Sequence, residues 1–236
     1  MIKEDIHKLL FIDIETVGID EDLDSLHHTN PKLSKVWGET GWDYFKRKYS
    51  EDSELSSNEM FIKKAALLPE FGKIVCISVG FILPSGETKL DSFYGDEKNL
   101  LIATSELLNR VDKLGFVMCG HNVKNFDLPY IAKRMLINNI PVPKILPNYT
   151  IKPWESRVLD TKEVWGFNSF GGLSSLNLVC TSLGLETSKE GEVNGSNMHK
   201  YYYDSNNIEK IKNYCEEDVK CTINLVKKLK KLWKIY

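Results

Sequence analysis

The chain has 236 residues, and 31 basic against 33 acidic side chains give it a formal net charge of −2 at pH 7. Hydrophobic residues make up 42% and charged residues 27%, which is typical of a globular protein and excludes a disordered or fibrous chain. The near-neutral charge excludes a general polyanion-binding protein, so any nucleic-acid contact must be local or assisted by a metal ion. The 5 cysteines include no Cys-x-x-Cys pair, which argues against a disulfide framework or a cysteine zinc site.

The sequence contains no apolar stretch long enough to span a bilayer. The longest nearly uncharged stretch, residues 74–85, is interrupted by Gly80 and Pro84. The N-terminus, MIKEDIHKLLFIDIET, has acidic residues where a signal peptide would be basic. We therefore expect a cytoplasmic protein without membrane contact.

The predicted elements begin with an apolar run at residues 9–15, which is typical of a central strand buried on both faces. Residues 73–83 and 88–94 predict a hairpin joined by Pro84-Ser85-Gly86. Further along the chain we expect a helix at 99–111, a strand at 115–119, a helix at 127–138, a strand at 157–159, and helices at 174–183 and 207–232. This order predicts an α/β domain around a mixed sheet.

Residues 17–70 interrupt that order. They are polar and charged, yet they contain Trp37, Trp42, Tyr44, Phe45 and Tyr49, which is too aromatic for disorder. We interpret them as a partly helical insertion after the first strand rather than a separate domain. Residues 1–236 are thus expected to form a single domain.

Asp13 and Glu15 are the first candidates for a functional site. Residues two apart on a strand point to the same face, so both carboxylates converge. Two like charges at one place are costly without a cation, and carboxylate oxygens suit Mg²⁺ or Mn²⁺. Acidic residues spaced this way also occur on solvated surfaces by chance, but this pair follows four apolar residues.

Asp127 ends the second candidate motif, His-Asn-Val-Lys-Asn-Phe-Asp at residues 121–127. Strand ends and helix starts meet at one edge of an open α/β sheet, so Asp127 is expected to face the first carboxylate pair. Asp is also a common residue at a helix start without any functional role. Asp160 is expected to cap a helix or to support the site, and Ser174 or Ser175 to cap the helix at 174–183.

Tyr214 and Asp218 form the third candidate motif. They are four residues apart on a predicted helix, and therefore one turn apart on the same face. Asp218 could complete a carboxylate cluster, and the phenol of Tyr214 could orient a metal-bound water. Taken alone, Tyr214 is better explained as a half-buried packing residue.

Together, the motifs FIDIET, HNVKNFD and YCEED resemble the DEDD superfamily of 3′–5′ exonucleases, which share a ribonuclease H-like fold. Asn213 stands where the histidine branch has its His, and Tyr214 stands where the tyrosine branch has its Tyr. With ALLPEFGKIVCISVGF, the chain is most similar to bacterial predicted exonucleases related to the proofreading domain of B-family DNA polymerases. The resemblance implies a mixed five-stranded sheet flanked by helices.

The resemblance also implies a two-metal site with Mg²⁺ or Mn²⁺. Asp13, Glu15 and Asp218 would hold one ion, and Asp13 with Asp127 would hold the second. Tyr214 would position the attacking water. All five residues are therefore the expected catalytic residues, and the four carboxylates are the expected metal ligands.

Substrate contacts follow from the same resemblance. Thr16 would lie near the terminal 3′-hydroxyl, while Asn122 and Phe126 would hold the terminal nucleotides. Phe126 could stack on any base, although it is also explained as a core residue. Because the insertion at 17–70 leaves directly after Thr16, we expect it to form a lid or substrate flap.

The expected function is thus a metal-dependent 3′–5′ exonuclease that acts on single-stranded DNA with a free 3′ end and releases nucleoside 5′-monophosphates. An exoribonuclease with the same site is the first alternative, because the sequence does not show how a 2′-hydroxyl is treated. A catalytically silent nuclease fold that only binds nucleic acid is the second, although no carboxylate of the set is missing.

Overall fold

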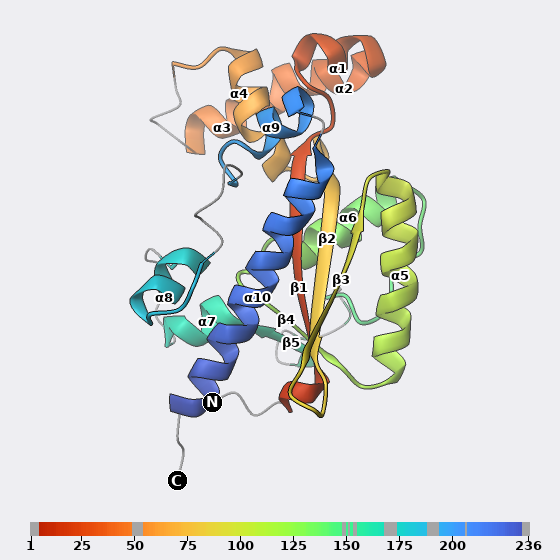
Figure 1. Ribbon diagram of the computed structural model, residues 1–236. Coiled ribbons are helices and arrows are strands. Elements are labelled where there is room, and N and C mark those ends of the chain that lie inside the picture. Colours follow the sequence, from red (N-terminus) through yellow and green to blue (C-terminus); the bar gives the residue numbers. More distant parts are fainter. Residues whose placement is uncertain are drawn as a thin grey trace.

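The computed structural model describes residues 5–48, 54–147, 150, 152, 155–167, 174–187, 194–205 and 207–232. Within these residues, one mixed sheet has the strand order β3-β2-β1-β4-β5 (Figure 1). Its strands are β1 (Leu9–Gly18), β2 (Gly72–Ile82), β3 (Thr88–Tyr94), β4 (Val117–Gly120) and β5 (Val158–Asp160). All five are predicted within three residues at either end, and the mixed five-stranded α/β sheet is confirmed.

Strand β1 is the centre of the sheet. It pairs antiparallel with β2 and parallel with β4. A β-bulge interrupts its register with β2 between Glu15 and Thr16, after which Val17 and Gly18 still pair with the start of β2. The strand therefore extends three residues beyond its predicted end, and the insertion begins after Gly18.

Helices cover both faces of the sheet (Figure 1). They are α5 (Glu97–Lys113), α6 (Asp127–Ile137), α7 (Thr161–Gly166), α8 (Leu176–Ser182), α9 (Met198–Ser205) and α10 (Ile208–Leu232). The sequence predicts α5, α6, α8 and α10 but neither α7 nor α9. Among the described residues, no helix is both long and apolar enough to cross a membrane.

The alternation of side chains along β1 separates two hydrophobic cores. Leu10, Ile12 and Ile14 pack into the core that contains residues of α5 and α6. Leu9 and Phe11 point to the opposite face and pack into the core that contains residues of α8 and α10. Both faces of β1 are covered by a hydrophobic core, which is why the strand needs apolar side chains at successive positions. The predicted central strand is confirmed.

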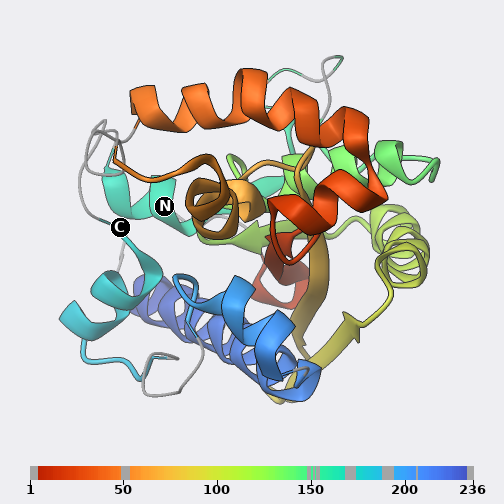
Figure 2. The same cartoon turned by 90° about the horizontal axis from the view of Figure 1, so that it is seen from above.

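The insertion between β1 and β2 is helical, as predicted. Its elements are α1 (Leu23–Thr29), α2 (Pro31–Val36), the π-helical segment η2 (Trp37–Gly41), α3 (Trp42–Lys48), α4 (Ser57–Lys64) and the 3₁₀ turn η4 (Ala65–Leu67). These helices lie at the end of the sheet where β1 ends and β2 begins (Figures 1 and 2). Tyr49, one of the aromatic residues that argue for order, lies outside the described residues.

Trp37 is at the centre of a separate hydrophobic core in the insertion. The residue is 0% exposed, and its ring centroid lies 5.1 Å from that of Phe61, 5.0 Å from that of Phe71 and 6.0 Å from that of Phe45. Its indole N–H donates to the carbonyl of Ser57 at 3.2 Å. Trp37, Phe45 and Phe61 thus bury one another, which explains why helices form in so polar a segment.

Helix α9 fastens the end of β1 through a buried histidine. The Gly18 N–H donates to Nδ1 of His199 at 2.9 Å, so Nε2 carries the ring proton and donates to the Glu21 carbonyl at 2.7 Å. Burial lowers the pKa of His199, which keeps the ring neutral. Tyr203 donates its hydroxyl to the carbonyl of Gly18 at 2.9 Å. These tertiary contacts stabilise a short helix that lacks a sequence signature.

Replacing Trp37 by alanine should lower the free energy of unfolding by about 3–5 kcal/mol, because the change leaves a cavity among three aromatic rings. Urea unfolding followed by circular dichroism would measure the loss. Tyr44, which is 43% exposed on α3, provides the matched control. Tyr44→Ala should cost less than about 0.5 kcal/mol, and equal losses in both variants would contradict the assigned core.

Candidate active site

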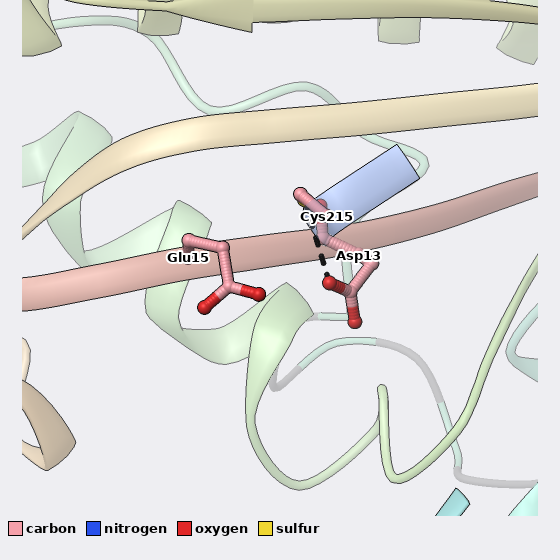
Figure 3. A group of neighbouring side chains, drawn as sticks. All are labelled: Asp13, Glu15 and Cys215. Carbon is pink, nitrogen blue, oxygen red and sulfur yellow. Dashed lines mark hydrogen bonds between the residues drawn. The ribbon is translucent and has the colours of Figure 1, made fainter. Parts of the chain in front are cut away.

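Asp13 and Glu15 lie on β1 and point to the face that α10 covers. Figure 3 shows their carboxylates side by side, next to Cys215 of α10. Oδ2 of Asp13 accepts a hydrogen bond from Sγ of Cys215 at 3.4 Å. Glu15 is only 8% exposed, and its carboxylate makes no hydrogen bond or ion pair with any residue in the described ranges. A buried carboxylate without a partner is costly, and a bound cation would offset that cost.

Asp127 joins the pair at the start of α6. Its Oδ1 accepts a hydrogen bond from the backbone N–H of Ile14 at 3.2 Å. The ladder between β1 and β4 ends at Phe11 and Cys119, so this carboxylate takes the place that a neighbouring strand would otherwise occupy. Asp127 is 4% exposed. The predicted approach of Asp127 to the first carboxylate pair is thereby observed.

Asp218 and Tyr214 come from α10, which crosses the β1 face (Figure 1). The four-residue spacing places both on one side of the helix. Tyr214 is half buried and packs against a cluster that includes Val17, Cys76 and Cys215. Three elements far apart in the sequence, β1, α6 and α10, therefore supply the five predicted catalytic residues.

The carboxylates interact because Glu15 and Asp127 are buried and Asp13 and Asp218, which are partly exposed, lie close to them. Burial, followed by the charge of Asp218, raises the pKa of both Asp13 and Glu15 well above the ordinary range. Burial also raises the pKa of Asp127 to about 7, with the charges of Asp160 and Asp218 acting in the same direction. Among the described residues, no Lys or Arg is a principal influence on these pKa values, so the cluster resists full ionisation until another positive charge is present.

The donor set of this cluster fits a hard divalent cation. The four carboxylates carry oxygen atoms of the kind that Mg²⁺ and Mn²⁺ prefer. Within the described residues, ligand atoms that all lie within 4.8 Å of one another come from Asp13, Glu15 and Cys215. Cys215 is the member of this group that the sequence motifs do not predict, because the distance between a helix and a strand cannot be read from spacing along the chain.

The three predicted substrate-binding residues flank the carboxylates. Thr16 follows Glu15 on β1 and donates its hydroxyl to the carbonyl of Ala66 at 3.0 Å. Asn122 adopts a left-handed φ of 65° and accepts a hydrogen bond from Nζ of Lys162 at 3.3 Å. Phe126 is half buried, immediately before Asp127. All three lie next to the site in the chain, while their contact with a nucleotide stays a prediction.

Asp160 holds the loop that leads into α6. Its buried carboxylate accepts hydrogen bonds from the backbone N–H groups of Asn122 at 2.9 Å, Lys124 at 3.0 Å and Lys162 at 2.9 Å. It is also the N-cap of α7, which confirms the predicted capping role. Ser175 is likewise confirmed as the N-cap of α8. By fixing the backbone at residue 122, Asp160 sets the path of the chain toward Asp127.

Comparison with known proteins adds family information to this geometry. Residues 66–232 match a family described as a predicted 3′–5′ exonuclease related to the exonuclease domain of PolB. The DNA polymerase III PolC-type of Mycoplasma genitalium is 25% identical over 179 residues, which cover 75% of this chain and 10% of that protein. The chain therefore spans about a tenth of the length of this relative.

Solved structures show the same fold. The family B DNA polymerase of the hyperthermophilic archaeon Pyrobaculum calidifontis superposes with a TM-score of 0.58 and 16% sequence identity. The match covers 94% of this chain and 24% of the polymerase. The mixed sheet and its helices thus have the ribonuclease H-like architecture of a polymerase exonuclease domain, as the sequence predicts.

The raised pKa of Asp127 predicts a pH-dependent stability of the metal-free protein. Because the folded-state pKa lies above the unfolded value, the native state binds the extra proton, and stability decreases as the pH rises from about 4 to about 7. Asp127→Asn retains an oxygen for the Ile14 N–H but cannot ionise. We expect it to exceed the wild type in unfolding free energy by roughly 1–4 kcal/mol at about pH 8, with no difference near pH 4.

Denaturant unfolding in the presence of a chelator would measure this difference. Glu106→Gln, on the exposed side of α5, is the control and should change stability by less than about 0.5 kcal/mol at either pH. A variant Asp127→Asn that is less stable than the wild type at the higher pH would contradict the electrostatic account.

Proposed function

The chain belongs to the family of predicted 3′–5′ exonucleases related to the exonuclease domain of PolB, and on that premise we propose that it is a metal-dependent 3′–5′ exonuclease acting on single-stranded DNA. One observation supports this proposal most: three carboxylates, Asp13, Asp127 and Asp218, interact with a buried glutamate, Glu15, that has no hydrogen-bond or ion-pair partner among the described residues. A folded protein retains such an arrangement at a cost, which is typical of catalytic sites.

In this proposal, Asp13, Glu15 and Asp218 hold one divalent cation, and Asp13 together with Asp127 holds a second. When bound, two such ions stabilise the entering and departing oxygens of a phosphodiester displacement. The low exposure of Glu15 and Asp127, 8% and 4%, would place bound cations in a setting with little water. The products would be nucleoside 5′-monophosphates and a strand shortened at its 3′ end.

Tyr214 would orient the attacking water. It lies one helical turn before Asp218 on α10, so the hydroxyl and the carboxylate can address the same region. Its ring is held by packing against buried neighbours of β1, β2 and α10, which restricts its position. A positioned hydroxyl of this kind reduces the entropic cost of bringing water to the phosphorus.

The 3′ end of the substrate would be held by Thr16, Asn122 and Phe126. The ring centroid of Phe126 lies 5.4 Å from that of Tyr130, so the Phe126 ring packs against a buried residue. A supported aromatic ring can stack on any base, as an exonuclease without sequence preference requires. Asp160 accepts a hydrogen bond from the backbone N–H of Asn122. This bond would hold Asn122 and Phe126 in a fixed position relative to Asp127.

We also propose that residues 1–236 act as one exonuclease domain in which the insertion is a substrate flap. Thr16 and Tyr130 both donate to the carbonyl of Ala66 at 3.0 Å, which ties the end of the insertion to β1 beside Glu15. Helix α3 bears three successive cations at residues 46–48 next to an exposed Tyr44. Cations with an exposed aromatic residue favour binding of single strands.

The reaction can be tested with 5′-labelled single-stranded DNA and a matched RNA in the presence of Mn²⁺. The wild type should produce a ladder that shortens from the 3′ end of the DNA, and Asp13→Asn should reduce the rate at least about 1,000-fold because both cation sites use Asp13. In the same assay, Tyr214→Phe should lower kcat by about 100-fold at an unchanged KM.

Glu217→Gln is the matched control, since Glu217 is an exposed acidic residue beside Asp218 on α10. It should retain wild-type activity. Preferential cleavage of the RNA would replace the proposed substrate by RNA, and no cleavage of either strand would favour the catalytically silent binding fold.

If the insertion is a substrate flap, substitutions in it should weaken substrate binding without changing metal binding. The double variant Lys46→Ala, Arg47→Ala should weaken the affinity for oligo-dT by about 3- to 10-fold, because cations near phosphates contribute to binding. Its affinity for Mn²⁺ should not change. Lys89→Ala, on the edge strand β3, is the control for a general charge effect. Equal oligonucleotide affinity in both variants would contradict the flap.

A further inference from the structure

Cys215 is a buried thiol that the proposed reaction does not use. Its Sγ lies 3.4 Å from Oδ2 of Asp13 and 3.5 Å from the Asp13 carbonyl oxygen. The residue is 0% exposed. Its sulfur and the carboxylate oxygens of Asp13 and Glu15 all lie within 4.8 Å of one another (Figure 3). The cluster therefore contains a soft ligand among hard ones.

The separation between sulfur and oxygen fits coordination by one ion. In a tetrahedral site with metal–sulfur and metal–oxygen bonds of about 2.3 and 2.0 Å, the two ligand atoms are about 3.5 Å apart. The observed distance from Sγ of Cys215 to Oδ2 of Asp13 is 3.4 Å. Both atoms could therefore bind the same cation with little movement of the side chains.

Glu15 gives independent support for a cation at this place. Its side chain is more than nine-tenths buried, has no hydrogen-bonding or ion-pair partner in the described chain, and points toward the same space as Asp13 (Figure 3). One thiolate and two carboxylates leave a fourth position for water. This combination suits Zn²⁺, Co²⁺ or Cd²⁺, whereas Mg²⁺ does not select sulfur.

We propose that Cys215, Asp13 and Glu15 form a binding site for thiophilic divalent cations of the Zn²⁺ class, which exclude hard cations from the two shared carboxylates. On binding, the thiol proton leaves to solvent and a metal–sulfur bond forms, without oxidation or reduction. The site makes the protein sensitive to the ratio of Zn²⁺ to Mg²⁺. It follows from the position of Cys215 and is independent of the proposed nuclease activity.

Titration of the metal-free full chain with Co²⁺ tests the proposal directly. Thiolate ligation to Co²⁺ produces a charge-transfer band in the near ultraviolet, which carboxylate ligation does not produce. We expect this band to saturate at one equivalent and to vanish when Zn²⁺ displaces Co²⁺. Cys215→Ser should lack the band and should bind Zn²⁺ about 10-fold or more weakly, while its Mn²⁺ affinity stays within about threefold.

Cys221→Ser is the matched control, because Cys221 is another buried cysteine of α10 whose Sγ donates to the carbonyl of Glu186. It should keep the band. Absence of the band from the wild type, or its persistence in Cys215→Ser, would overturn the proposal. The wild-type spectrum tests the proposal even if the variants fold poorly. Far-ultraviolet circular dichroism identifies any variant that folds poorly.

A nuclease assay distinguishes this proposal from the proposed function. With Mg²⁺ as the activating ion, added Zn²⁺ should inhibit the wild type, and Cys215→Ser should need about 10-fold more Zn²⁺ for the same inhibition. If no strand is cleaved under any condition, the proposed function is wrong. The Co²⁺ spectrum still tests whether Cys215 binds a thiophilic cation.

Discussion

Mutual repulsion among buried carboxylates is the constraint around which this structure is arranged. Asp13 and Glu15 continue an apolar strand that is covered on both faces, so the packing that stabilises the sheet buries Glu15 and leaves Asp13 only partly exposed. Burial and the neighbouring charge of Asp218 raise the pKa of both groups. The fold thereby stores an unfavourable interaction that a divalent cation would relieve.

The elements around β1 each contribute to holding that cluster in place. Asp127 binds the backbone N–H of Ile14, where β4 has ended, so a catalytic candidate also completes the hydrogen bonding of the central strand. Asp160 fixes the loop before α6 through three backbone hydrogen bonds. Helix α9 fastens the end of β1 through His199, directly where the insertion departs. Rigid support of this kind is needed for carboxylates that repel one another.

The sequence predicts the sheet well because the five strands have strong local patterns. The same patterns place Asp13, Glu15, Asp127, Tyr214 and Asp218 on elements that converge. Features that depend on tertiary contacts are not predicted from the sequence. Helix α9 depends on the contacts of His199 and Tyr203 with Gly18, and the bulge after Glu15 extends β1. The approach of Cys215 to Asp13 depends on how closely α10 packs on the sheet, which no spacing along the chain reveals.

The carboxylate cluster is expected to cost stability until a divalent cation occupies it. The most direct test compares the wild type with Asp13→Asn, Glu15→Gln by thermal unfolding at neutral pH, with chelator and with saturating Mn²⁺. The variant should be the more stable protein in chelator. Mn²⁺ should raise the Tm of the wild type and leave the Tm of the variant unchanged. A wild type that is more stable than the variant in chelator and does not respond to Mn²⁺ would contradict this expectation.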